Sequence, residues 1–131
     1  MLFFYPWLSL LFSHHIQTLK IILLIDTFMV SVIYSTTDTL ETARTIARSL
    51  VKEKLVACVH ILPKIESIYR WQGKMEEANE YVLLAKTSER NVQQTIQKIR
   101  SLHPYEVPEI LVFPPVGGLK EYLEYVEEET R

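Results

Sequence analysis

Two residues two positions apart, Cys58 and His60, are the first candidates for chemistry in this chain. They lie in the run LVACVHIL, whose apolar and β-branched residues are typical of a buried strand. Residues two apart on a strand point to the same face of the sheet, so the thiol and the imidazole would lie side by side. Such a pair suits Cu(I), Cu(II) or Zn(II). The alternative interpretation makes Cys58 a small buried apolar residue and His60 a hydrogen-bonded residue at an interface.

A second candidate is the stretch SLHPYEVPEI, in which His103 precedes two carboxylates, Glu106 and Glu109. Two prolines fix this loop, and a fixed loop can hold a carboxylate near an imidazole for metal binding or for a buried hydrogen bond. His103 is therefore a candidate third ligand for a metal at the thiol–imidazole pair. The alternative is that the stretch only turns a helix into a strand, with the histidine interacting favourably with the helix dipole.

Catalysis and nucleic-acid binding are not expected of this sequence. It contains no G-x-S-x-G, H-E-x-x-H or P-loop motif. A hydrolase that uses His103 with Glu106 or Glu109 is the weakest hypothesis, because no nucleophile stands out. A net charge of −2 with scattered basic residues argues against nucleic-acid binding. The single cysteine cannot form an internal disulfide, which favours a cytoplasmic location.

Residues 1–28 are more apolar than the rest of the chain. Neither of their two apolar runs reaches the ~20 residues that span a bilayer, and they lack the positive start and the small-residue cleavage site of a secretory signal. We therefore expect no stable membrane insertion. We interpret residues 1–28 as an extension that results from an upstream start, with Met29 as the biological start. The alternative is a membrane-surface anchor.

Residues 29–131 show the strand and helix patterns of one small domain. Alternation from Val30 to Tyr34 predicts a strand, and an apolar stripe from Leu40 to Val51 predicts an amphipathic helix. The predicted elements follow the order strand, helix, strand, strand, helix, strand, with an extra C-terminal helix. This is the ferredoxin-like βαββαβ order of an α+β sandwich, whose antiparallel sheet carries helices on one face.

Local signals predict where these elements begin and end. Asp38 followed by Glu41 resembles a capping box before the first helix. Ser88 or Thr87 is positioned to cap the second helix. Gly73 indicates a turn between the second and third strands.

Three aromatic residues, Tyr69, Trp71 and Tyr81, lie on the second and third strands, and we expect them to pair across the hairpin. The strand LVACVHIL is apolar on both sides, so the sheet face opposite the helices must also be covered. One small domain does not supply that cover. We therefore expect an oligomer whose sheets pack on each other, with these three aromatic residues at the interface.

Three stretches carry a family resemblance: ACVHILPKIESIYRWQGKMEE (57–77), EYVLLAKT (80–87) and LHPYEVPEI (102–110). In their order and spacing they resemble the CutA divalent-cation-tolerance family, from about Met29 to Arg131. The resemblance implies a ferredoxin-like homotrimer, similar in assembly to the PII signalling proteins. It also implies a response to copper or other divalent metal ions, with no established enzymatic activity.

The resemblance further implies a set of metal ligands. Cys58 matches the strand cysteine of the A-C-x-x-I motif, His103 the histidine of H-P-Y, and Glu109 the acidic residue of P-E-I. A second cysteine, proposed as a copper ligand in some bacterial members, is absent here. His60 stands where the family typically has asparagine and would partly replace that thiol. The predicted metal ligands are therefore Cys58, His60, His103 and Glu109, and the predicted cofactor is copper or another divalent cation.

The second hypothesis is a PII-like signalling trimer that binds a small anionic ligand in the clefts between subunits. Lys86, Arg100 and the helix start at Gly117–Gly118 would then contact the anion. On the residues alone, metal binding and anion binding both stay open.

Overall fold

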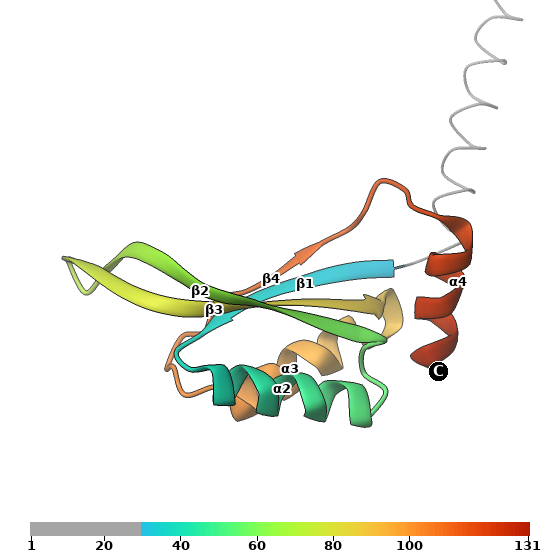
Figure 1. Cartoon of the computed structure of the whole chain (residues 1–131), viewed down its shortest axis with the longest axis horizontal. Coiled ribbons are helices and arrows are strands. Elements are labelled where there is room, and N and C mark those ends of the chain that lie inside the picture. Colours follow the sequence, from blue (N-terminus) through green and yellow to red (C-terminus); the bar gives the residue numbers. More distant parts are fainter. Residues whose placement is uncertain (1–29) are drawn as a thin grey trace, which may run out of the picture.

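A four-stranded antiparallel sheet forms the centre of the fold, in the strand order β2-β3-β1-β4. The computed structural model describes residues 30–131, so the predictions for residues 1–28 and for a start at Met29 lie outside the described residues. Figure 1 shows α2 and α3 together on one side of the sheet, and α4 at one end of it. The elements in chain order are β1 (Val30–Thr37), α2 (Leu40–Lys52), β2 (Cys58–Trp71), β3 (Lys74–Ser88), the 3₁₀ turn η1 (Glu89–Asn91), α3 (Val92–Leu102), β4 (Ile110–Phe113) and α4 (Lys120–Glu129).

The predicted βαββαβ order is confirmed. Strands β1 and β3 lie in the middle of the sheet, and β1 pairs antiparallel with both β3 and β4. Helix α2 connects β1 to β2, and α3 connects β3 to β4, which is the ferredoxin-like arrangement. Among the described residues, no helix is long and apolar enough to cross a bilayer.

The hydrophobic core lies between the sheet and helices α2 and α3. Its largest buried side chains are at most 2% exposed: Ile33, Ile46, Leu50, Leu83 and Ile99. The buried residues of α2 recur at three- and four-residue steps, as the predicted apolar stripe requires. Burying each such side chain stabilises the fold by ~1.5–3 kcal/mol, so this helix-covered face supplies most of the apolar stabilisation.

Both helix caps differ from the prediction. Helix α2 is capped by Thr39, whose hydroxyl accepts a hydrogen bond from the Thr42 amide at 3.1 Å. The carboxylate of Asp38 accepts instead from the threonine before it, so the predicted capping box does not form. Strand β3 continues to Ser88, and the turn η1 then precedes α3, which places Asn91 at the start of that helix. The predicted caps of α3 therefore belong to the strand.

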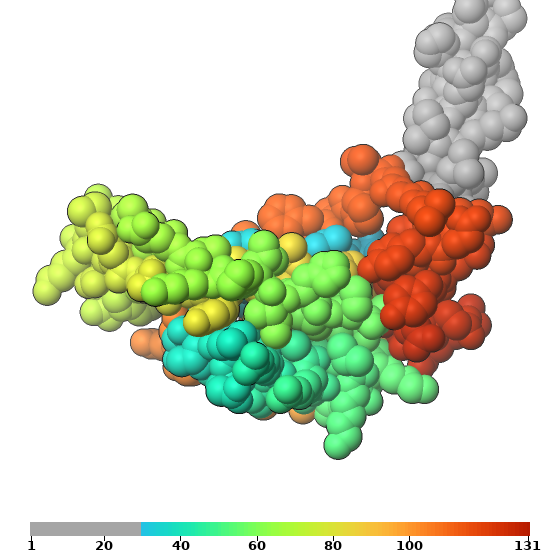
Figure 2. All heavy atoms as spheres, in the orientation of Figure 1, coloured from blue at the N-terminus to red at the C-terminus, as the bar shows by residue number. Residues whose placement is uncertain are grey.

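Strands β2 and β3 form a long hairpin that projects beyond the helices (Figure 1) and makes a protrusion in the space-filling view (Figure 2). The predicted turn at Gly73 is confirmed. Gln72 and Gly73 have φ angles of 50° and 77°, the two positive values that a type I′ turn requires. A register shift between Leu62 and Ile65 marks a bulge at Pro63, which has no N–H to donate to the ladder.

The predicted pairing of Tyr69 and Trp71 with Tyr81 across the hairpin is wrong. Tyr69 pairs with Glu76, and Trp71 pairs with Lys74, because the two-residue turn fixes the register. Tyr81 pairs with β1 instead and packs, partly buried, against the helix-covered core.

Candidate functional site

The sheet face opposite α2 and α3, which we call the open face, carries the candidate metal ligands of β2. Val59 and Ile61 pack against the helix-covered core, so Cys58 and His60, which alternate with them, point to the open face. Helix α4 covers one end of this face, where Val126 is buried. Register and alternation assign these residues to the open face: Val32, Tyr34, Thr36, Cys58, His60, Leu62, Val82, Leu84, Lys86, Leu111 and Phe113.

Cys58 and His60 have different surroundings on the open face. The Cys58 sulfur lies 3.3 Å from the hydroxyl of Tyr122 on α4. Burial, and then this hydrogen bond, raise the pKa of Tyr122 to about 12, so the phenol stays protonated beside the sulfur at neutral pH. His60 is exposed. An exposed imidazole beside a half-buried thiol leaves both groups within reach of a ligand that approaches from outside the sheet.

His103 ties the loop after α3 to the end of the central strand β1. One ring nitrogen, Nε2, lies 2.7 Å from the carbonyl oxygen of Thr36, and the other, Nδ1, accepts a hydrogen bond from the Tyr105 amide at 3.1 Å. These partners assign the neutral tautomer with the proton on Nε2. Both nitrogens are engaged, so the imidazole would have to give up one of these hydrogen bonds before it could ligate a metal.

The structure does not bring the four predicted metal ligands together in one chain. Cys58 pairs with Lys86, and Thr36, which holds His103, pairs with Val82. These two places lie four residues apart along β3, or about 13 Å. Within residues 30–131, no group of three or more His, Cys, Asp or Glu side chains is arranged to hold a metal ion. The metal role of His103 and Glu109 stays a prediction.

Glu109 lies instead at a second feature, which we call the acidic cleft. It is a cleft of about 690 Å³ between β1, the outer part of the hairpin and the loop after α3. The Glu109 main chain is fixed to β1, because its carbonyl oxygen accepts a hydrogen bond from Ser35 at 2.7 Å. The side chains that line the cleft are Tyr34, Thr36, Ile65, Glu66, Ser67, Ile68, Tyr69, Trp71, Glu80, Tyr105, Glu106, Val107 and Glu109.

Sequence reasoning missed Glu80, the most buried carboxylate of the cleft. It is 6% exposed, and the Tyr105 hydroxyl donates a hydrogen bond to it at 3.0 Å. Burial raises the pKa of Tyr105, and the bond to Glu80 raises it further. Burial also raises the pKa of Tyr34, with smaller contributions from Glu109 and Glu80. A signal was present in the stretch EYVLLAKT. Glu80 is two residues from Val82 and four from Leu84, so strand alternation points this carboxylate to the same sheet face as two apolar side chains.

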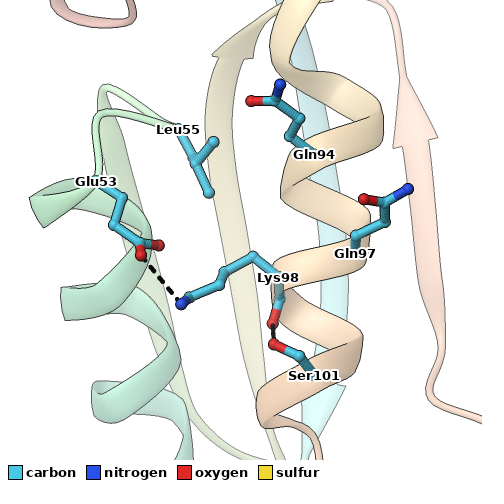
Figure 3. A pocket seen from close by; sticks show the side chains of 6 residues that line it. All are labelled: Glu53, Leu55, Gln94, Gln97, Lys98 and Ser101. Atoms are coloured by element: carbon cyan, nitrogen blue, oxygen red, sulfur yellow. Dashed lines mark hydrogen bonds and ion pairs between the residues drawn. The ribbon is translucent and has the colours of Figure 1, made fainter.

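A second groove, between α2 and α3, is a weaker candidate. Figure 3 shows the side chains along it, which come from the end of α2, the connection after it and one side of α3. Its charged pair is neutralised internally, because Lys98 and Glu53 form an ion pair at 3.1 Å. Ser101 donates to the Lys98 carbonyl at 2.7 Å. These polar groups satisfy one another and leave no unbalanced charge for a ligand.

The residues predicted for anion binding lie on different sides of the molecule. Lys86 is 8% exposed, points to the open face, and donates a hydrogen bond to the Leu84 carbonyl at 3.0 Å. Arg100 lies on α3, which packs on the opposite face of the sheet. One chain therefore does not form an anion site from both residues, and a site between subunits stays a prediction.

The three aromatic residues predicted for an interface do not lie on one surface. Tyr69 and Trp71 on the hairpin are 45% and 40% exposed, whereas Tyr81 packs toward the helices. On the open face, Leu111 and Phe113 are 48% and 52% exposed. The apolar surface available to a partner therefore lies on the open face and the hairpin.

The fold and these features define a class: a small ferredoxin-like α+β protein with a long projecting hairpin and one sheet face that the described residues leave open. The chain belongs to the CutA1 divalent ion tolerance protein family, whose sequence model matches residues 31–129. The family predicted from the three sequence stretches is therefore confirmed.

Individual relatives show how far this similarity extends. The divalent-cation tolerance protein CutA of Thermus thermophilus is 45% identical over 102 residues, which cover 78% of this chain and 99% of that protein. Protein CutA of Homo sapiens is 40% identical over 101 residues, covering 77% of this chain and 56% of that protein. The chain thus spans little more than half the length of the human relative, and 55% of the chloroplastic protein of Arabidopsis thaliana.

Solved structures share the fold. The crystal structure of CutA from Xylella fastidiosa superposes with a TM-score of 0.77 at 43% identity, covering 79% of this chain and 99% of that chain. The structure of the divalent cation tolerance protein of Thermus thermophilus also gives a TM-score of 0.77, at 45% identity, covering 79% of this chain and 100% of that chain.

Proposed function

We propose that the protein acts in divalent-cation tolerance as a homotrimer that binds copper or another divalent cation through Cys58 and His60. The observation that carries the proposal is the placement of a thiol and an imidazole side by side on a sheet face that residues 30–131 leave open. The family and its Thermus thermophilus member are named for divalent-cation tolerance, and a thiol with an imidazole is a ligand pair that suits copper and zinc.

The open face favours assembly with further copies of the chain. Exposed apolar side chains such as Leu111 and Phe113 lie beside half-buried ones on one continuous face. Monomeric proteins rarely leave such a surface to water, and identical subunits commonly cover it. The family resemblance implies three copies, so we expect a mass three times the 15.4 kDa of the chain.

Assembly would also complete the metal site. Zinc and copper sites in proteins have three or four ligands, and one chain offers only the Cys58–His60 pair at this place among its described residues. The remaining predicted ligands, His103 and Glu109, lie about 13 Å away along the sheet of the same chain. In the proposed trimer they would reach the pair from a neighbouring copy.

Calorimetry and light scattering test this proposal together. We expect the purified chain to elute as a trimer and to bind Cu(II) or Zn(II) at micromolar concentration. Cys58→Ser and His60→Ala should each weaken binding by tenfold or more, which corresponds to ~1.4 kcal/mol. Lys64→Ala, an exposed change on the same strand, is the matched control. A trimer that binds neither metal would exclude the metal role and leave the assembly intact.

Lys86 supports the second hypothesis, anion binding between subunits. It is only 8% exposed on the open face, and it has no carboxylate partner among the described residues. A buried ammonium group without a counter-ion is costly, and an anionic ligand would supply the missing charge. A thermal-shift screen with nucleotides and small carboxylates tests this, because a ligand of the folded state raises the midpoint. Equal midpoints with every anion would argue against it.

The cellular location of the protein and its lack of catalytic activity stay predictions. The relatives are named chloroplastic in Arabidopsis thaliana and in rice, and periplasmic in the Archaeoglobus fulgidus structure. The cytoplasmic location favoured by the single cysteine is therefore part of the proposal, as is a binding role without catalysis.

A further inference from the structure

The candidate thiol of β2 has a close neighbour on the C-terminal helix. The sulfur of Cys58 lies 3.3 Å from the hydroxyl oxygen of Tyr122, and either atom can be the donor. The two residues are 64 positions apart in the sequence. Helix α4, which the sequence indicates only as an extra element after the last strand, therefore brings a polar group to the sulfur atom.

Contacts within the chain fix the position of α4. Val126 is fully buried against the sheet. The Thr130 hydroxyl, at the end of the helix, donates a hydrogen bond to the hydroxyl of Ser88 at 3.0 Å. Arg90 forms an ion pair with Glu127 at 2.8 Å. Because these contacts join parts of one chain, the approach of Tyr122 to the thiol does not depend on which copies cover the open face.

A second tyrosine of α4 lies beside the first and makes a different contact. The rings of Tyr122 and Tyr125 have centroids 5.8 Å apart. The hydroxyl of Tyr125 lies 3.5 Å from the main-chain carbonyl oxygen of Ala57, the residue before Cys58. One phenol therefore reaches the sulfur and the other reaches the backbone next to it. This difference separates an effect on the sulfur from an effect on the packing of α4.

The direction of the hydrogen bond follows from metal-binding chemistry. A cysteine loses its proton when it ligates a metal ion, so the Cys58 sulfur can then only accept a hydrogen bond and the Tyr122 hydroxyl must donate it. Groups that hydrogen-bond to a metal ligand hold it in place, and their loss typically weakens metal binding by ~10–100-fold. Hydrogen bonds to a cysteine sulfur also tune the electronic properties of a bound copper ion.

We propose that Tyr122 is a positioning residue of the metal site: its hydroxyl donates a hydrogen bond to the metal-bound thiolate of Cys58. This role rests on the proposed metal function and adds a residue to it. Tyr122 acts through the sulfur and is not itself a ligand. Helix α4 then has a part in metal binding besides covering one end of the sheet (Figure 1).

A measurement without metal tests the contact itself. Cys58 is the only cysteine of the chain, so the S–H stretching band in the infrared spectrum of the full-length protein has a single source. Tyr122→Phe removes the hydroxyl and keeps the ring, and it should shift this band. Tyr125→Phe removes the neighbouring hydroxyl, which contacts a carbonyl oxygen instead, and should leave the band in place.

Metal titrations of the same two variants test the role. Tyr122→Phe should weaken Zn(II) binding about tenfold or more, and Tyr125→Phe should not. With Co(II) in place of Zn(II), the charge-transfer band from sulfur to metal should move to longer wavelength in Tyr122→Phe alone. The reason is that a hydrogen bond to the thiolate stabilises the electrons that are transferred. A change in the packing of α4 would not by itself move this band.

The outcomes separate this role from the metal function. An S–H band that is the same in Tyr122→Phe and the natural protein would show that the contact is absent and would overturn the proposal. A shifted band with unchanged Zn(II) affinity and Co(II) spectrum would overturn it too, and would leave the metal function intact. If the natural protein binds neither ion, the metal function fails and this role fails with it, while the S–H band still reports the contact.

Discussion

The two faces of one sheet differ in what covers them. Toward α2 and α3, side chains such as Ile33 and Leu83 are at most 2% exposed. On the open face, Leu111 and Phe113 of the neighbouring strand are about half exposed. Because strand residues alternate, the same strands supply both faces. The difference indicates that the helix-covered face supplies most of the hydrophobic core, whereas the open face leaves apolar side chains exposed within residues 30–131.

Buried polar groups also differ between the two faces of the sheet. On the helix-covered side the buried hydroxyls are neutral and satisfied: Thr87 donates to the Leu55 carbonyl at 2.6 Å, and Ser35 donates to the Glu109 carbonyl at 2.7 Å. On the open side, Glu80 and Lys86 are buried charges with one hydrogen-bonded neighbour each and no ion pair within residues 30–131. Unbalanced charge is costly within a monomer, and in the described residues it lies on the face that the proposed assembly would cover.

The largest expected effect is a difference in stability between the two faces. Ile46→Ala deletes a fully buried side chain and should lower the free energy of unfolding by about 2–5 kcal/mol. Leu111→Ala, at 48% exposure, should cost less than about 1 kcal/mol in the monomer. Chemical denaturation over a series of protein concentrations measures both.

The dependence of these two stability costs on protein concentration tests whether copies of the chain cover the open face. If copies cover the open face, the cost of Leu111→Ala grows with protein concentration, because assembly stabilises the folded chain by mass action. The cost of Ile46→Ala should grow much less. Equal costs at all concentrations would indicate that the open face stays exposed to water.

A smaller effect separates the two histidines. His103→Ala removes hydrogen bonds to Thr36 and to the Tyr105 amide, and each is worth about 0.5–1.5 kcal/mol. His60→Ala changes an exposed side chain on the open face and should alter stability by less than about 0.5 kcal/mol. Thermal or urea denaturation without metal measures the difference.

Amide hydrogen exchange tests the same two histidine variants at a single backbone position. The Tyr105 amide should exchange faster in His103→Ala than in the natural protein, because its acceptor is gone. His60→Ala should leave that amide protected. If His60→Ala costs as much stability as His103→Ala, then His60 has a structural role that its exposure does not indicate.

Much of the fold was predictable because its signals are local. The apolar stripe that places Ile46 in the core repeats at helical spacing, and Gly73 supplies the positive φ of its turn. The cap at Thr39 was missed because Asp38 and Thr39 are both good capping residues. Only the extended backbone of Thr39, with φ of −130°, decides between them.

The site was harder to predict because its contacts are distant in sequence. The bond from His103 to Thr36 spans 67 residues, and the bond from Tyr105 to Glu80 spans 25. Strand alternation placed Cys58 and His60 on one face without knowledge of either contact. No periodicity indicates that the loop after α3 closes a cleft against the hairpin, since that depends on tertiary packing.

The smallest effect is a shift in the titration of one tyrosine beside the candidate thiol. Burial, and then the bond to Cys58, raise the pKa of Tyr122 to about 12. For an acid whose pKa is raised by folding, the contribution to stability is full below the ordinary value of about 10. It is lost as the pH rises through about 12.

Absorbance of tyrosinate near 295 nm measures this titration. Below about pH 11 the curves of Tyr122→Phe and of the natural protein should coincide, because Tyr122 is still protonated there, and they should diverge above it. Cys58→Ala should move the Tyr122 step to lower pH only in part, since burial is the larger cause. A tyrosine signal already missing from Tyr122→Phe at about pH 10 would mean that water reaches the phenol freely. The thiol would then lie on a more open surface than the contact with α4 implies.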